Sequence, residues 1–185
     1  MVSRNEKSVK RKIASCIPCQ ASTNSFQREP LKMSPTPRVP WLQASADFCS
    51  PFPTGETVLV VLDAYSKYPE VENVSSVAAK DTIPALERIF ATHGIPEVLK
   101  TDSGSPFQSH AFQSFAKEKG FTHRKITPLW PEANGHVEGF MKNLRKAARS
   151  AHSRGKDLRR ELYVFLANYR ATPTQVLGRA LTSYA

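Results

Sequence analysis

The sequence has no hydrophobic run long enough to cross a membrane. A spanning helix needs about 18 or more consecutive apolar residues, and no such stretch occurs in the 185 residues. The first residues, MVSRNEKSVKRK, also lack the apolar segment of a secretory signal peptide. We therefore expect an intracellular protein with no membrane partner.

Cysteines and acidic residues are also scarce. The three cysteines are an odd number, which favours a reducing compartment over a disulfide framework. Asp and Glu number 16 against 26 Lys and Arg, so the formal net charge is +10. This excess favours a polyanionic partner such as nucleic acid, although an anionic membrane surface would also attract it.

Length and composition predict one main domain preceded by a basic arm. A hydrophobic content of 40% is enough for one core of ordinary size. Residues 20–40 are polar and rich in proline, with no helical or alternating pattern, and are interpreted as a linker. We therefore predict an arm with a truncated zinc-module remnant at residues 1–38 and the main domain at residues 39–185.

The arm contains a Cys-x-x-Cys pair, Cys16 and Cys19. Such a pair supplies half of many zinc sites, because a tight turn points both sulfurs at one metal. No histidine precedes it to complete a site, so we expect two free thiols and no zinc in this chain.

The main domain predicts a mixed sheet flanked by helices, in the order βββαβαβ followed by two helices. The first three strands have short connections and should form an antiparallel meander. Asp81 is the expected N-cap of the first helix, and Gly120 should end the second. The expected strands cover residues 41–48, 57–62, 70–74, 98–101 and 121–126.

The helix predicted after Pro131 has two contrasting faces. Its apolar stripe has helical spacing and should pack on the sheet. On the other face a single acid, Glu138, is followed by Lys142, Arg145 and Arg149. The apolar stripe comprises Val137, Phe140, Met141, Leu144, Ala148 and Ala151.

Three acids occupy comparable places in the pattern. Asp47 ends the first strand, Asp102 ends the fourth, and Glu138 follows Asp102 with 35 residues between them. With the surrounding phrases, the chain resembles the integrase catalytic core of retroviruses and Gypsy-type retrotransposons, including transposon-derived host genes. The matching stretches are ADFCSPFP, VLVVLDAYSKYPEV, IFATHGIPEVLKTDSGSPFQS, TPLWPEANGHVEGFMKNL and ELYVFLANYRATP.

The resemblance implies a ribonuclease H-like fold with a mixed five-stranded sheet. It also implies that Asp47, Asp102 and Glu138 are catalytic and bind two Mg²⁺ or Mn²⁺ ions, hard cations that prefer oxygen ligands. The implied activity is a metal-dependent polynucleotidyl transferase or endonuclease that processes DNA ends and joins them to target DNA, as in DNA integration and recombination. A homo-oligomer in the nucleus is the implied working form.

Other residues receive lesser roles. Lys142, Arg145 and Arg149 are predicted to contact DNA phosphates, although a solvated basic face is an equal alternative for Arg149. Asn134, in the segment before Glu138, should belong to a loop that completes the site when DNA binds. Three further residues are expected to be structural: Asp63 as a turn-orienting acid, and His93 and His123.

The sequence departs from the family pattern in several places. Ser103 stands where Asn is usual, and Gly139 follows Glu138. From the residues after Pro173 we expect no C-terminal DNA-binding module. An inactive or host-adopted nucleic-acid-binding remnant is therefore the main alternative. A ribonuclease H-type nuclease is a weaker alternative. The sequence does not distinguish an active integrase-type enzyme from an inactive or host-adopted remnant.

Overall fold

The computed structural model describes residues 37–50, 52, 55–126 and 135–172, together with positions 8, 9, 12, 15 and 16. Internal contacts divide the chain into two units, Met1–Met33 and Ser34–Ala185, and the fold below is that of the second. Cys19 and Asn134 lie outside the described residues, so their assignments stay predictions, as does the domain boundary after residue 38.

The second unit is built on a five-stranded sheet in the order β3-β2-β1-β4-β5. The first three strands form the predicted antiparallel meander, while β4 and β5 run parallel to β1. The sheet is mixed because helical crossovers precede β4 and β5. The strands are β1 (Gln43–Cys49), β2 (Thr57–Asp63), β3 (Pro69–Val74), β4 (Val98–Thr101) and β5 (Thr122–Lys125).

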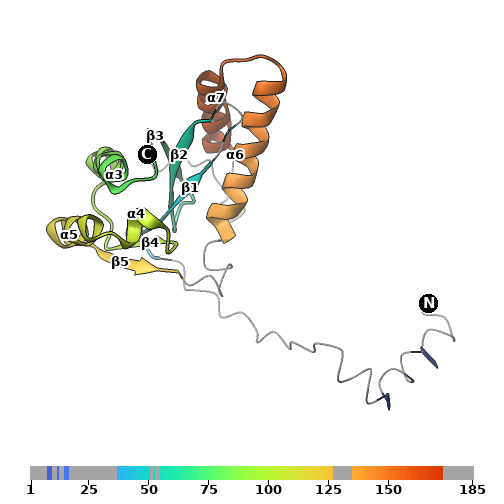
Figure 1. Cartoon of the computed structure of the whole chain (residues 1–185), viewed down its shortest axis with the longest axis horizontal. Coiled ribbons are helices and arrows are strands. Elements are labelled where there is room, and N and C mark those ends of the chain that lie inside the picture. The colour runs from blue at the N-terminus through green and yellow to red at the C-terminus, as the bar shows by residue number, and fades with distance from the viewer. Residues whose placement is uncertain are drawn as a thin grey trace. The chain divides into compact units, whose positions relative to one another are not determined.

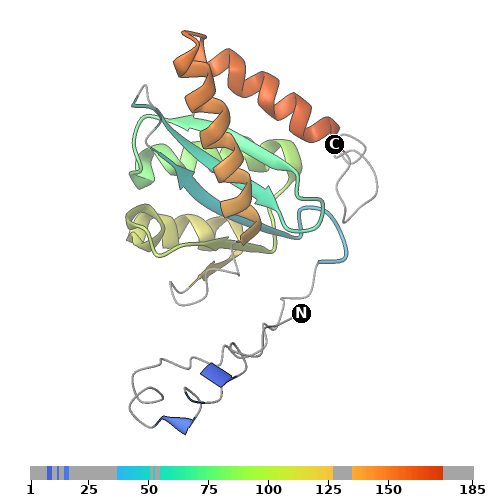
Figure 2. The same cartoon turned by 90° about the vertical axis from the view of Figure 1, so that its right-hand side faces the viewer.

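Helices cover both faces of the sheet (Figures 1 and 2). On one face lie α3 (Ala79–His93), α4 (Ser105–Gln108) and α5 (His110–Lys119). On the other lie α6 (Gly135–Ser153) and α7 (Leu158–Ala171). Because strand residues alternate between faces, each face has its own core. Ala44, Ala46 and Leu99 belong to the α3–α5 side, whereas Val58 and Val60 belong to the α6–α7 side.

One helix prediction was wrong in detail. The first helix begins at Ala79, with Ala78 at the N-cap position, so Asp81 is not the cap. Asp81 instead accepts a hydrogen bond from the Ser76 hydroxyl within the first turn. The second predicted helix is confirmed as α5, which ends at Gly120. The Ser109 hydroxyl accepts a hydrogen bond from the Phe112 N–H at 3.1 Å and caps the start of α5.

The two-faced helix prediction is confirmed. The apolar stripe of α6 is buried against β1 and β2, and this packing leaves Glu138, Lys142 and Arg149 exposed. Among the described residues, no helix is both long and apolar enough to cross a membrane.

Candidate active site

Two of the three predicted acids are brought together by strand register. β1 and β4 are parallel neighbours, with Ala46 paired to Thr101. Asp47 follows Ala46 in β1, and Asp102 follows Thr101, the last residue of β4. Because the two strands are parallel and in this register, these two carboxylates lie side by side although 54 residues separate them in the sequence. Asp47 lies within β1 and does not end it as predicted, since the strand continues to Cys49.

Glu138 comes close to Asp47 from α6, although Asp102 is not among the residues that line the hollow these two share. The apolar residues on either side of it, Val137 and Phe140, are buried, which fixes the rotation of the first turns of the helix. An open hollow of about 580 Å³ results between α6 and β1. Its lining comprises Asp47, Gly135, Glu138, Gly139, Met141, Lys142 and Arg145.

The charges around Asp47 act on its carboxyl group in opposite directions. Burial is the largest influence, and with the nearby negative charges of Asp102 and Glu138 it raises the pKa of Asp47 to about 6. The Phe48 N–H, which donates to Asp47 Oδ1 at 2.7 Å, and the Arg145 guanidinium both lower that pKa without cancelling the rise. Both of the other predicted acids therefore act electrostatically on Asp47.

Asp102 is held by its own turn. Its Oδ1 accepts a hydrogen bond from the Gly104 N–H at 2.9 Å, which is the usual geometry of an aspartate orienting a turn. The carboxylate lies so close that a Cβ built on Gly104 would be 2.9 Å from that oxygen. Gly104 therefore provides the space that Asp102 occupies.

The residues present fit a hard divalent cation. Three carboxylates supply only oxygen ligands, the donor type that Mg²⁺ and Mn²⁺ select. Among the described side chains, no group of three or more His, Cys, Asp or Glu is arranged closely enough to hold a metal ion. Like charges repel, so the carboxylates have no reason to converge without a cation.

The basic residues of α6 divide into two kinds. Lys142 and Arg149 are exposed, as residues that contact phosphate should be. Arg145 is partly buried, hydrogen-bonded to the Cys49 thiol and close enough to Asp47 to lower its pKa. The sequence predicted a phosphate contact for Arg145 but did not reveal its contact with Cys49, because that contact depends on how α6 packs on β1.

The structural roles predicted for two residues are confirmed. Asp63 is buried and accepts hydrogen bonds from the backbone N–H groups of Trp41, Tyr65 and Ser66. His93 stacks on Trp41 at 4.0 Å between ring centroids.

His123 is also structural, and it contacts Thr101, the residue before Asp102. Its Nε2 is 2.9 Å from the hydroxyl of buried Thr101, which donates to the Asp102 carbonyl at 2.8 Å. Because the single hydroxyl proton of Thr101 is used there, Nε2 must be the donor to Thr101. This pair fixes the end of β4 from which Asp102 projects.

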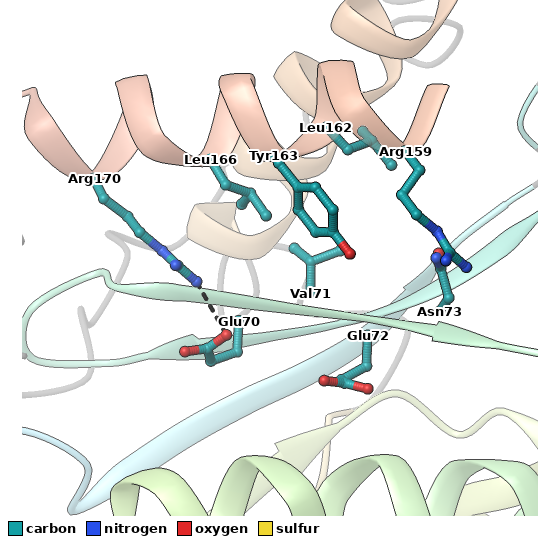
Figure 3. A pocket seen from close by; sticks show the side chains of 9 residues that line it. All are labelled: Glu70, Val71, Glu72, Asn73, Arg159, Leu162, Tyr163, Leu166 and Arg170. Carbon is teal, nitrogen blue, oxygen red and sulfur yellow. Dashed lines mark hydrogen bonds and ion pairs between the residues drawn. The ribbon is translucent and has the colours of Figure 1, made fainter. Parts of the chain in front are cut away.

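A second cavity of about 400 Å³ lies between β3 and α7 (Figure 3). Both carboxylate oxygens of Glu70 are occupied there: Oε1 is 2.7 Å from His93 Nε2, and Oε2 accepts from Arg170 at 3.0 Å. Glu70 thus joins α3, β3 and α7. The cavity is a structural junction and does not contain the three acids.

Comparison with known proteins identifies relatives of the chain. Residues 40–131 match the family model described as integrase core domain. An uncharacterized protein of Caenorhabditis elegans is 33% identical over 92% of this chain and 13% of its own length. The Pro-Pol polyprotein of feline foamy virus is 32% identical over 60% of this chain, and the Gag-Pro-Pol polyprotein of mouse mammary tumor virus is 29% identical over 65%. The chain spans only 10% and 7% of these viral polyproteins.

The fold also matches a solved structure. The intasome of simian T-cell lymphotropic virus, determined in complex with PP2A regulatory subunit B56 gamma, contains a chain that superposes with a TM-score of 0.79. The sequence identity is 17%, and the match covers 97% of this chain and 66% of that chain. The predicted ribonuclease H-like fold is confirmed.

Proposed function

Because residues 40–131 belong to the integrase core domain family, we propose that this chain is a polynucleotidyl transferase that processes DNA ends and joins them to target DNA. The observation that carries the proposal is the register of β1 and β4. It sets Asp47 beside Asp102, facing the hollow that Glu138 also lines. Family membership supports the reaction class, and this geometry supports the assignment of residues.

In this proposal Asp47, Asp102 and Glu138 hold one or two Mg²⁺ or Mn²⁺ ions. When bound, the ions supply charge stabilisation for the attacking and leaving oxygens at a phosphodiester. The protein's own part is to position the carboxylates, with Asp47 in β1, Asp102 directly after β4 and Glu138 on α6. Arg145 offsets part of the negative charge at Asp47, while exposed Lys142 and Arg149 attract the DNA backbone.

Oligomerisation and a nuclear location extend the proposal to the whole protein. The chain spans only a small share of the relatives it matches. The complete reaction with paired DNA ends is therefore proposed for the whole protein, acting as a homo-oligomer bound to DNA. A nuclear location would follow from that substrate.

A DNA-binding protein without chemistry is the second candidate. The exposed lysine and arginine side chains of α6 would attract a DNA backbone whether or not the acids bind metal. The two candidates predict the same binding and differ only in strand cleavage and joining.

The deciding experiment measures nicking and strand transfer on short labelled DNA duplexes with Mn²⁺. Wild-type protein should convert the duplex, and Asp102→Asn should not, because the amide removes one anionic ligand. Lys117→Ala, on the exposed surface of α5, serves as the matched control and should retain activity. Equal product with wild type and Asp102→Asn would contradict the assignment. DNA binding without product would favour the second candidate.

A further inference from the structure

Two basic side chains are neighbours on β4 and β5. The parallel register of β4 and β5 pairs Lys100 with Arg124. Paired residues in adjacent strands project from the same face of a sheet, so both side chains leave the sheet together.

That face is the one that bears the acids. Lys100 is paired with Ser45 on β1, and Ser45 lies two residues before Asp47. Within β4, Lys100 lies two residues before Asp102, a separation of about 7 Å along a strand. The intervening Thr101 faces the opposite layer, where it contacts His123. Strand geometry alone thus puts a basic pair beside the acidic pair.

Lys67 adds a third cation from the turn between β2 and β3. Its backbone has a φ of 64°, which is uncommon for a residue other than glycine, and its Nζ donates to the Ala64 carbonyl at 2.6 Å. Burial and the positive charge of Lys100 lower the pKa of Lys67. Lys100 is in turn paired with Arg124 across the two parallel strands. Lys100 therefore lies close to both Lys67 and Arg124, and these like charges repel.

These repulsions are not relieved by salt bridges in the described part of the chain. No ion pair found there includes Lys67, Lys100 or Arg124. Asp63 does attract Lys67, but its carboxylate already accepts hydrogen bonds from Trp41 and Ser66. Lys67 and Lys100 are half-buried and Arg124 is exposed. Like charges held close together cost folding free energy, and an anionic partner would offset that cost.

We propose that Lys67, Lys100 and Arg124 form a second phosphate-binding surface, in which Lys100 and Arg124 hold the DNA backbone on the opposite side of the acids from Lys142. The helix that carries Lys142 packs on β1 and β2, whereas Lys100 and Arg124 belong to β4 and β5. A strand contacted from both sides would have its reactive phosphodiester fixed over Asp47 and Asp102. The choice of DNA as the anion rests on the proposed function.

The test measures how DNA affinity depends on salt, using the full chain and a fluorescently labelled duplex. Removal of one phosphate-binding charge should reduce the slope of log K against log salt by about 0.9. Lys100→Ala and Arg124→Ala should each reduce the slope by about one such unit, and the double variant by about two. Lys67→Asn removes the charge with a residue that tolerates positive φ, and it should behave like the other single variants. Lys100→Arg should retain the wild-type slope.

Lys117→Ala is the matched control, since Lys117 is exposed on α5 against the opposite face of the sheet. If an alanine variant does not fold, as judged by circular dichroism, Lys100→Gln and Arg124→Gln replace it. Slopes of the Lys100 and Arg124 variants equal to that of Lys117→Ala would overturn the inference. Wild-type protein that binds no duplex would reject DNA as the anion. Lack of strand cleavage by a wild-type chain that binds DNA would count only against the proposed function.

Discussion

At the scale of single residues, the site depends on a close approach between a carboxylate and a glycine. Asp102 accepts the Gly104 N–H and occupies the space where a side chain at position 104 would lie. The backbone of Gly104 has a φ of −63°, so any residue could adopt its conformation. Glycine is needed there for space and not for backbone freedom.

Gly104→Ala should therefore disturb the site more than the fold. The added Cβ would lie 2.9 Å from Asp102 Oδ1, so the carboxylate must rotate out of its turn. We expect a small change in melting temperature and a clear loss of Mn²⁺-dependent nicking. Thermal unfolding and the nicking assay, run on the same preparation, separate the two effects. Unchanged nicking would mean that Asp102 need not hold this position for the reaction.

Asp47 should make stability depend on pH. Its pKa is about 6 in the folded state against 3.8 for an unperturbed aspartate, so the folded state binds more protons between these values. The free energy of unfolding should therefore fall as pH rises from about 4 to about 6, and should stay lower above that range.

Asp47→Asn should remove this contribution, since its amide oxygen can still accept the Phe48 N–H but does not ionise. With a chelator present, we compare the free energy of unfolding of the variant with that of wild type. The variant's value relative to wild type should be higher at about pH 7 than at about pH 4. A constant difference in unfolding free energy between the two proteins would show that the Asp47 carboxyl is not perturbed.

At the scale of elements, α6 combines packing with presentation of Glu138. Its apolar stripe is buried and its polar face lines the hollow, yet Gly139 interrupts the first turns. Glycine in a helix costs about 1 kcal/mol relative to alanine. Gly139 therefore destabilises α6 directly beside Glu138, the acid that the helix places at the hollow.

Gly139→Ala should raise the free energy of unfolding by about 1 kcal/mol. A Cβ at this position would meet nothing within 4 Å, so no packing penalty opposes the gain in helix propensity. Gly120→Ala is the contrasting control, because its φ of 78° makes the same substitution unfavourable by about 1 kcal/mol. Chemical denaturation of both variants measures the two signs. A loss of stability for Gly139→Ala would show that α6 requires glycine there.

At the scale of the whole molecule, the arm and the main domain present separate questions. The described residues place the three acids in the second unit, and Cys16 belongs to the first. Nothing in the proposed chemistry requires zinc in the arm.

We expect no stoichiometric zinc in the purified 185-residue chain. Two thiolates are half of the usual four ligands, and a half-site leaves the remaining positions to water. Elemental analysis after exhaustive dialysis measures the zinc content, and a Cys16→Ser variant is the control. One zinc per chain that is absent from Cys16→Ser would contradict this expectation.

The sequence by itself determined the element types, the two-faced α6 and the three acids. The elements and the two faces of α6 follow from local rules, namely alternation along a strand and helical spacing, and the acids follow from the resemblance to a family. Lys142 and Arg149 could be predicted as exposed for the same reason, since they lie opposite the buried stripe of their own helix.

Only the tertiary structure decided which distant residues meet. The pairing of Lys100 with Arg124, the approach of Lys67 and the contact of Arg145 with Cys49 all depend on register and helix packing. Register is a non-local property, because a strand's alternation shows which residues share its faces but not which residue lies opposite on the next strand. The acids were found from a family pattern, whereas the basic cluster beside them has no sequence signature, since its members come from a turn and two separate strands.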